Sequence, residues 1–485
     1  MEVRTIFRNI SPIDHRYSLS EQDLFDDLIP WLSEEAAVGS CVKAEIALVI
    51  AHLTVRGGLT SEVKEALETI AASIDPTEVY REEEKTKHNI RALVNVLKRR
   101  VPAETAPLVH LGATSADILD TAQSFRMRGV TLQVVIPLLQ NLELLLCAFV
   151  DKEAETPQVG RTHGQHAVPI TLGFALAEYV SRLGKSILEI ARLSRGLKGK
   201  LAGAVGAYNA TAMIVQDPEE LERRYLAELG LEPSEHATQL VEPEYLLRLL
   251  LEYNVAFGII ANLADDLRNL QRSEIGELRE GFGEEQVGSS TMPQKRNPWN
   301  SEHVKSLWKA FMPRVTTFFM DQISEHQRDL SNSASQRFIA DYVTGFCLAV
   351  SRMSSVIEGL WADRERLSAN LQGSAGIPGG VMAEPAYILL AETGVSDAHE
   401  VIRRITLNAE QEHIGFAQAL SKEPALLDRI GGKLTELGLI GKPSEALSFF
   451  EHPEQYRGLS VKKAKTIAGK YRKLMTQGQE EPYVC

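Results

Sequence analysis

The sequence predicts an all-α protein of three helical domains arranged around a central bundle of long helices. Apolar residues recur at a spacing of three and four along 172–193 and 249–270. The segments 115–151, 301–325 and 335–365 follow the same pattern, whereas strand-like alternation with hairpin signals is almost absent. Helices with apolar faces this long must pack against one another, so we expect an elongated bundle in the middle of the chain.

Breaks in the helical pattern set the expected boundaries of the elements. Pro137 is expected to kink the helix over 115–151. A loop rich in Gly and Ser, 281–298, separates two long helices, and a second Gly-rich loop occupies 373–380. The Lys-rich stretch 462–473 is expected to be the solvated face of a helix. The expected domains are 1–112 (N-terminal helices), 113–364 (central bundle with the 281–298 loop) and 365–485 (C-terminal helices).

Composition excludes several classes of protein. A chain of 485 residues is too long for one core. With 52 basic and 65 acidic residues the net charge is −13, and no long basic run is present, which argues against a nucleic-acid partner. The longest apolar stretch, 134–150, is broken by polar residues, so we expect no membrane span.

The cysteines and histidines indicate neither a disulfide framework nor a metal site. The four cysteines are far apart without CxxC spacing, which is typical of a reducing compartment. The twelve histidines do not cluster with acidic residues at ligand spacing, so no metal is expected. The opening segment has no apolar core of signal-peptide length. We therefore expect a cytoplasmic protein.

The segment 288–298, GSSTMPQKRNP, is the most informative in the chain. Two serines, two cations and an amide in one loop suit the stabilisation of an anionic oxygen, although a flexible connection between helices would also be rich in Gly and Ser. The string closely resembles the GSSxMPxKxNP signature of the fumarase/aspartase superfamily. This resemblance implies an all-helical, tetrameric lyase that eliminates fumarate or a relative from a succinyl group. Ser289 would be the base, and Lys295 and Asn297 would hold the substrate carboxylate.

A histidine segment, 160–166, also resembles the superfamily. A lone histidine before a helix is often structural, but the resemblance implies that His163 faces the leaving group and protonates it as a general acid. Thr162 beside it is expected to contact the substrate. Glu302 occupies the position where relatives hold a carboxylate against this histidine, so we expect a His163–Glu302 pair that orients the ring. His166 has the weaker claim to the acid role.

The segment 110–115, HLGATS, resembles a third block of the superfamily. The resemblance implies that the hydroxyls of Thr114 and Ser115 donate to a substrate carboxylate and that His110 contacts the substrate. Without the family, either hydroxyl followed by Asp117 would be a cap for the next helix. Both interpretations can hold together, because a helix N-terminus is itself an anion site.

Segments outside the shared blocks resemble adenylosuccinate lyases. The segment 11–17, SPIDHRY, is similar to a block whose Arg and Tyr touch the nucleotide phosphate in that family, and 84–89, EKTKHN, is similar to a block with an active-site histidine. Here the resemblance assigns substrate contacts to Arg16, Tyr17, His88 and Asn89.

Two further segments complete this resemblance. The stretch RDLSNS at 328–333 is similar to the block in which two arginines and a serine form the phosphate site, and Gln239 fits the position of a glutamine that contacts substrate. The residues assigned in this way are Gln239, Arg328, Ser333 and Arg337. The arginines would give an acidic protein a cationic pocket for a phosphomonoester, although each alone could make a surface ion pair.

The chain departs from the family pattern in four places. The family's arginine shortly after the glutamine is not evident in 240–243, and three residues differ in type. Lys87 replaces an arginine, Asn89 stands where an aspartate is usual, and Asn332 replaces a histidine. These departures leave the superfamily resemblance intact and bear on substrate preference.

The resemblance implies a lyase that needs no cofactor. Its substrates would be adenylosuccinate and the succinyl-carboxamide ribotide of purine synthesis, and it would be a homotetramer whose active sites are shared between subunits. One alternative is a superfamily lyase or cycloisomerase of the argininosuccinate or carboxymuconate type. Another is a non-catalytic protein on the same scaffold, which would be expected to have lost its acid or base.

Overall fold

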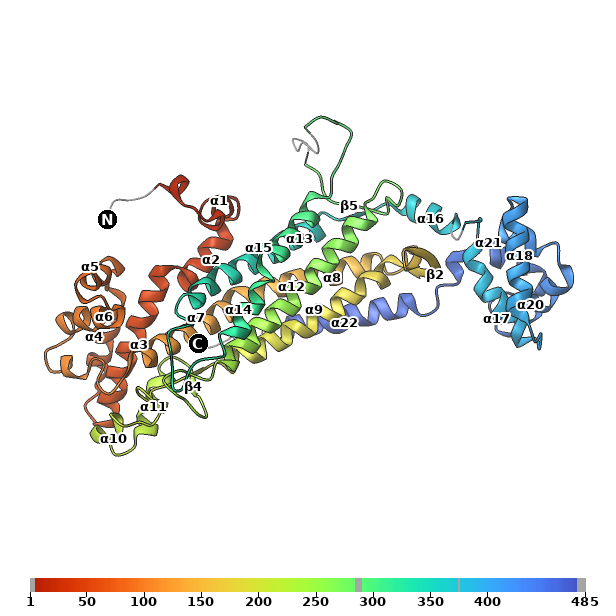
Figure 1. Cartoon of the computed structure of the whole chain (residues 1–485). Coiled ribbons are helices and arrows are strands. Elements are labelled where there is room, and N and C mark those ends of the chain that lie inside the picture. Colours follow the sequence, from red (N-terminus) through yellow and green to blue (C-terminus); the bar gives the residue numbers. More distant parts are fainter. Residues whose placement is uncertain (1–4, 284–289, 374–375, 478–485) are drawn as a thin grey trace.

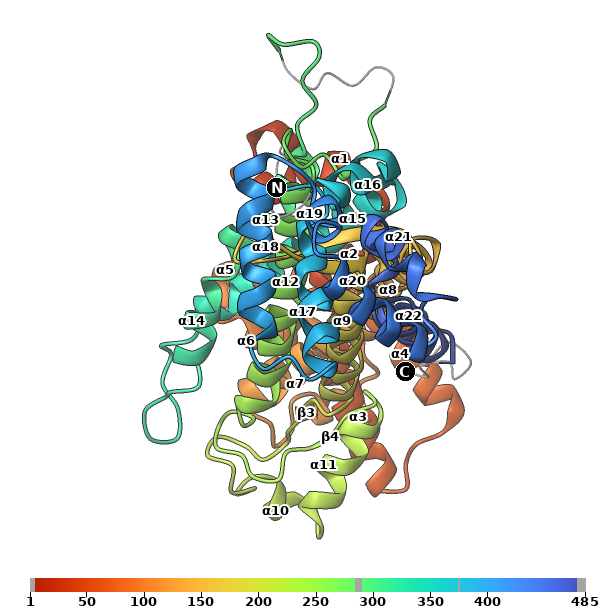
Figure 2. The same cartoon turned by 90° about the vertical axis from the view of Figure 1, so that its right-hand side faces the viewer.

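The computed structural model describes residues 5–283, 290–373 and 376–477. It confirms the predicted all-α class: long helices form an elongated bundle, with smaller helical groups at its two ends (Figure 1). Seen along its length, the bundle is narrow, and an arm that contains α14 projects from one side (Figure 2).

The N-terminal helices form one end of the molecule. Their bounds are α1 (Arg16–Ser20), α2 (Gln22–Leu32), α3 (Glu34–Val55), α4 (Ser61–Ala72), α5 (Pro76–Thr86) and α6 (Asn89–Arg100). Their core is shared with the first part of α7 and with α11, and its fully buried residues include Leu48, Leu67, Leu93 and Leu97. This end of the chain therefore has its own hydrophobic core.

The central bundle contains the longest helices. Its elements are α7 (Ser115–Val130), α8 (Ile136–Lys152), α9 (Leu172–Arg195), α10 (Thr211–Ile214), α11 (Pro218–Ala227), α12 (Glu244–Leu270), α13 (Trp299–Phe311), α14 (Arg314–Met320) and α15 (Ile339–Glu358). Between α7 and α8 a π-helical turn, Thr131–Val135, ends two residues before Pro137. An irregular turn at this point fits the absence of an N–H on proline. The helix predicted over 301–325 is instead two helices, which part at Pro313.

The remaining helices form the other end, with one exception. They are α16 (Arg364–Gln372), α17 (Ala383–Glu392), α18 (Ala398–Glu412), α19 (Phe416–Leu420), α20 (Pro424–Glu436), α21 (Ala446–Glu451) and α22 (Ser460–Gln477). Helix α22 returns to pack along α8 and α9, with Ala464, Ala468 and Tyr471 in the central core. Its lysines are exposed, as the sequence predicts.

Short strands form three two-stranded pairs in the part of the chain that the structure describes. They are β1 (Pro157–Thr162) with β2 (Gln165–Thr171), β3 (Lys198–Gly199) with β4 (Glu232–Pro233), and β5 (Leu278–Arg279) with β6 (Trp361–Ala362). The β1–β2 hairpin was not expected from the sequence. Its signal is weak because three successive residues of β1 are buried, so the strand shows no alternation of apolar and polar residues.

Within the described ranges, three helical stretches are long and apolar enough to cross a membrane by length and composition alone. They are Gln22–Val55, Ser115–Lys152 and Glu244–Leu270, and 67%, 61% and 56% of their most apolar windows are buried inside the protein. Most of this apolar surface therefore belongs to the protein's own core.

Candidate active site

A cavity of about 900 Å³ lies between the N-terminal helices, the start of α7 and the segment 328–340. Its lining comes from parts of the chain that are more than 200 residues apart. Eight of the residues predicted to contact substrate line it: His88, Asn89, Thr114, Ser115, Gln239, Arg328, Ser333 and Arg337. The tertiary structure thus gathers three of the sequence blocks into one site.

The first turn of α7 forms one wall of the cavity. Thr114 is the N-cap of α7, and its backbone N–H donates to Asp117 Oδ2 at 2.8 Å. The capping role expected for this segment is therefore confirmed. Because Thr114 and Ser115 stand at a helix N-terminus, the helix dipole also favours an anion beside their hydroxyls.

Behind this turn lies a buried ion pair. Asp117 and Lys200 are both fully buried, and Lys200 Nζ donates to Asp117 Oδ1. The same carboxylate accepts the backbone N–H groups of Ala202 (3.1 Å) and Gly203 (3.2 Å). The pair ties the start of α7 to the segment 200–203, so the position of Thr114 is fixed from behind.

On the opposite wall of the cavity, two of the predicted residues are hydrogen-bonded to each other. Arg328 Nη1 donates to Gln239 Oε1 at 3.0 Å, and the Gln239 backbone N–H donates to the carbonyl of Gln327 at 3.4 Å. Two residues after Gln239, the backbone N–H of Val241 donates to Asp120 Oδ2 on α7 at 3.0 Å. Burial raises the pKa of Asp120 to about 6.

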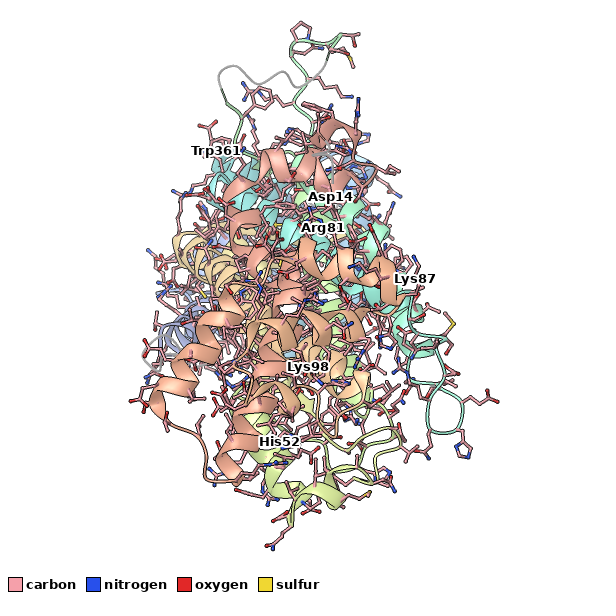
Figure 3. All side chains as sticks on the ribbon, turned by 90° about the vertical axis from the view of Figure 1, so that its left-hand side faces the viewer. Asp14, His52, Arg81, Lys87, Lys98 and Trp361 are labelled. Atoms are coloured by element: carbon pink, nitrogen blue, oxygen red, sulfur yellow. The ribbon has the colours of Figure 1, made fainter. Side chains whose placement is uncertain are left out.

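Lys87, Asn89 and Asn332 differ from the family pattern, and the structure gives each of them a local role. Lys87 ends α5 with a left-handed backbone (φ 55°) and lies on the edge of the N-terminal helices (Figure 3). His88 caps α6, its Nδ1 accepting the N–H of Arg91 at 3.3 Å, and Asn89 Oδ1 accepts the N–H of Ile90 at 2.8 Å.

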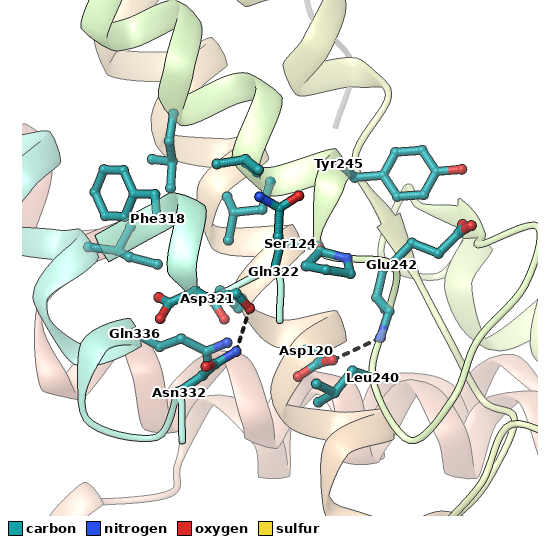
Figure 4. Close-up of a pocket in the computed structure, with 17 residues that line it drawn as sticks. Asp120, Ser124, Leu240, Glu242, Tyr245, Phe318, Asp321, Gln322, Asn332 and Gln336 are labelled. Atoms are coloured by element: carbon teal, nitrogen blue, oxygen red, sulfur yellow. Dashed lines mark hydrogen bonds between the residues drawn. The ribbon is translucent and has the colours of Figure 1, made fainter. Parts of the chain in front are cut away.

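The third departure faces a second, smaller cavity, which is shown in Figure 4. Asn332 Nδ2 donates to the carbonyl of Asp321 at 2.5 Å. This cavity adjoins the first, since Gln123, Gln336 and Ile339 line both. Asn332 therefore supports the segment that carries Arg328 and Ser333.

Sequence reasoning missed several residues of the main cavity. Tyr80 donates to Glu34 Oε1 at 2.5 Å, and burial, with the Glu34 hydrogen bond second, raises its pKa to about 12. Arg126 lines the same cavity, and burial lowers its pKa. Arg126 was detectable, because it follows Ser115 by 11 residues, three helical turns, and so shares its face of α7. No comparable signal marks Tyr80 or Glu34.

His163 lies at the tip of the β1–β2 hairpin, at the opposite end of the bundle from the N-terminal helices (Figure 1). Thr162 pairs with Gln165, which leaves a two-residue turn of His163 and Gly164 with φ of 55° and 73°. Two positive φ angles are typical of a type I′ hairpin turn. Thr162 and His163 are both exposed at this tip.

The signature loop leaves the bundle between β5 and α13. Ser289, the predicted base, lies outside the described residues; Lys295 is exposed and Asn297 half-buried. Glu280 closes the base of the loop, since its carboxylate accepts the backbone N–H of Asn300 (3.3 Å) and of Ser301 (3.1 Å) at the start of α13.

The expected His163–Glu302 pair does not form within one chain. Glu302 is exposed in the first turn of α13, and no hydrogen bond or ion pair between described residues joins it to His163. The reason is the separation of the two elements along the bundle: the hairpin lies at the β2 end, whereas α13 adjoins the loop at its side (Figure 1).

Three other predicted residues also lie away from the cavity lining. Arg16 and Tyr17 begin α1, and Tyr17 Oη lies 3.2 Å from His303 Nε2. His110 Nδ1 lies 2.7 Å from the buried carboxylate of Glu45. The described chain therefore brings Arg328 and Arg337 to one cavity but not Arg16.

Comparisons with known proteins identify the family of the chain. A family model described as "Lyase" matches residues 30–310, and one described as "Adenylosuccinate lyase C-terminal" matches 324–438. An adenylosuccinate lyase of Pyrococcus horikoshii is 34% identical over 83% of this chain and 88% of the relative. One of Archaeoglobus fulgidus is 31% identical over 90% and 95%.

Solved structures share the fold at lower identity. The crystal structure of a fumarate lyase from Mesorhizobium sp. BNC1 has a TM-score of 0.77 and 21% identity, covering 92% of this chain and 97% of its own. That of the 3-carboxy-cis,cis-muconate lactonizing enzyme from Pseudomonas putida has a TM-score of 0.75 and 23% identity, covering 93% and 97%. The helical fold and the signature blocks define a lyase of the fumarase/aspartase type. Within that class, the chain belongs to the adenylosuccinate lyase family.

Proposed function

We propose that the protein eliminates fumarate from adenylosuccinate, giving AMP, and from the succinyl-carboxamide ribotide of purine synthesis. The observation that carries the proposal is the main cavity, which joins Arg328 and Arg337 to the Thr114–Ser115 helix start in a chain of this family. The guanidinium groups suit a phosphomonoester, and the hydroxyls with the helix N-terminus suit a carboxylate. A substrate with an anion at each end fits such a lining.

The phosphate end of this site is the Arg328 side. Its Nη1 is already bonded to Gln239, which leaves other N–H donors of the guanidinium for a ligand. Ser333 and Arg337 follow Arg328 in the same segment and also line the main cavity. Substrates of the argininosuccinate and carboxymuconate type lack a phosphate, so this group of residues favours the nucleotide.

The elimination uses residues from the other two blocks. Ser289 takes the Cβ proton, and the electron pair moves into the neighbouring carboxylate, whose added charge Lys295 and Asn297 stabilise. The C–N bond then breaks, the pair returns to form the double bond of fumarate, and His163 protonates the departing nitrogen. The elimination includes no redox step, and it needs no cofactor.

The placement of the site residues supports an assembly of several copies of the chain. Within one chain, His163 at the β1–β2 hairpin tip lies at the opposite end of the bundle from the N-terminal helices that line the main cavity (Figure 1). We therefore propose a homotetramer with active sites shared between subunits, acting in the cytoplasm without a membrane or nucleic-acid partner. Pairing between His163 of one copy and Glu302 of another would restore the expected orientation of the ring.

The first test is the ultraviolet absorbance change after purified protein is added to adenylosuccinate. AMP with released fumarate, absent in Ser289→Ala, supports both the reaction and the base. If no AMP forms, the proposal fails, and argininosuccinate and carboxymuconate become the substrates to try.

Sharing of the site has a separate test. His163→Ala and Ser289→Ala chains, each expected to keep only a small residual activity by itself, are mixed under conditions that allow subunit exchange. Recovered activity is expected if the two residues come from different copies. Absence of recovery, with exchange verified by mass spectrometry, would count against the shared site.

A further inference from the structure

A buried carboxylate, that of Glu277, holds the hairpin that carries His163. Glu277 follows α12 and directly precedes β5, and its side chain is fully buried. Its Oε2 accepts Gln158 Nε2 at 2.7 Å and Arg161 Nη1 at 3.0 Å, and its Oε1 accepts Arg161 Nη2 at 2.5 Å. Asn370 Nδ2 on α16 donates to Oε1 at 2.8 Å. The carboxylate thus accepts four side-chain hydrogen bonds, three of them from β1.

The backbone of Glu277 is held as firmly as its side chain. Its N–H donates to the carbonyl of Leu270 at 2.9 Å, and its own carbonyl accepts the N–H of Asp363 at 2.9 Å. The residue is therefore fixed to the end of α12 on one side and to the start of α16 on the other. It is a fixed point to which the hairpin can be anchored.

The hairpin tip needs such an anchor. His163 has a left-handed backbone conformation, which is uncommon for a residue with a side chain and persists only where the surroundings impose it. Arg161 is the last residue before the Thr162–Gln165 closing pair, and its guanidinium is held on both Nη atoms by Glu277. A bidentate guanidinium–carboxylate contact fixes orientation as well as distance.

We propose that Glu277 is a positioning residue for His163, acting through Arg161 to hold the turn that presents the imidazole. The inference rests on the proposed function, in which His163 is the general acid. An error of about 1 Å in the position of a catalytic group can cost on the order of 100-fold in rate. The effect should therefore appear in kcat, whereas substrate binding in the main cavity is unaffected.

The test is a double-mutant cycle of Glu277→Gln with His163→Ala, in which kcat and KM are measured with adenylosuccinate. Glutamine keeps the shape but turns its amide N–H₂ toward the guanidinium donors. Glu277→Gln is expected to lower kcat about 10- to 100-fold with little change in KM. In the His163→Ala background the same change should cost less than about threefold, because the acid it positions is gone. An equal loss in both backgrounds, or none in either, would overturn the proposal.

Glu153→Gln is the matched control. Glu153 is also buried, and among the described residues its carboxylate accepts hydrogen bonds from Arg364 and from Thr156 Oγ1, not from Arg161. It should leave kcat within about threefold of the wild type. If Glu277→Gln chains do not fold, Arg161→Lys enters the same cycle, because lysine keeps the charge and loses the bidentate contact.

A readout without activity separates this inference from the proposed function. Hydrogen exchange of the peptide spanning 157–171 should be faster in Glu277→Gln than in both the wild type and Glu153→Gln. Unchanged exchange there would overturn the positioning role even in an active enzyme. A wild-type protein that makes no AMP would instead refute the proposed function, while the exchange result would still decide whether Glu277 holds the hairpin.

Discussion

Lys200→Met should strongly destabilise the protein. The side chain of Lys200 is fully buried, and its Nζ donates to Asp117 Oδ1 and to the carbonyl of Gly203 at 3.3 Å. Methionine has a similar length and fills the same space without a charge. The substitution therefore tests the charge of Lys200 rather than its volume.

The magnitude follows from what remains around Asp117. After the change its carboxylate keeps the backbone N–H groups of Thr114, Ala202 and Gly203 but no cation. Removing one partner of a buried ion pair typically costs about 3–5 kcal/mol, because the other charge stays buried and uncompensated. We expect a loss of free energy of unfolding in this range. Activity should fall as well, since Asp117 fixes the turn that carries Thr114.

The assay is urea unfolding followed by circular dichroism at one fixed chain concentration, because association shifts apparent stability. The informative control is the double variant Lys200→Met/Asp117→Asn, which removes both charges and should recover more than half of the loss. A cost below about 1 kcal/mol for Lys200→Met, or a double variant less stable than the single one, would refute the reasoning.

Three further predictions concern the helix packing around Glu143 and the arginine side of the main cavity. Glu143 is buried with neither carboxylate oxygen hydrogen-bonded, and burial raises its pKa well above the usual value. The folded state therefore binds a proton that the unfolded state releases above about pH 5, so the wild type loses stability as pH rises. Glu143→Met should stabilise the protein, and the gain in thermal unfolding scans should grow as pH rises toward 8. A gain that does not change with pH would contradict this. Gly184→Ala would place a Cβ against the ring of Tyr471 and 2.8 Å from Glu143 Oε1. It should therefore lower the free energy of unfolding by about 1–3 kcal/mol. An unchanged urea midpoint would show that α9 and α22 separate freely. Arg328→Ala should raise KM about 10- to 100-fold and weaken AMP binding by the same factor in calorimetry, because a charge-assisted contact is lost; equal AMP affinity would exclude Arg328 from the phosphate site.

The sequence determined the elements and located most of the chemistry. Helical periodicity predicted the long helices, since a repeat of 3.6 residues is a local property of the chain. The blocks around Thr114, Arg328 and His163 were recognisable because residue types at fixed short spacing define them. The cap at Thr114 was predictable for the same reason, as Asp117 follows it by three residues.

Tertiary structure decided which of these residues meet. Lys200 is 83 residues from Asp117, and Glu277 is 116 residues from Arg161, so no local pattern pairs them. The sequence did not predict that Tyr80 lines the cavity, because the position of Tyr80 depends on how α5 packs.

The same physics explains why the expected contact between His163 and Glu302 is not made within a single chain. Spacing along the sequence places His163 after one helix and Glu302 in another, but the rigid length of the bundle sets the distance between them. Helices can be predicted from residues that are close in the sequence. A site made of several segments depends instead on the packing of the long helices, and here on how copies of the chain would associate.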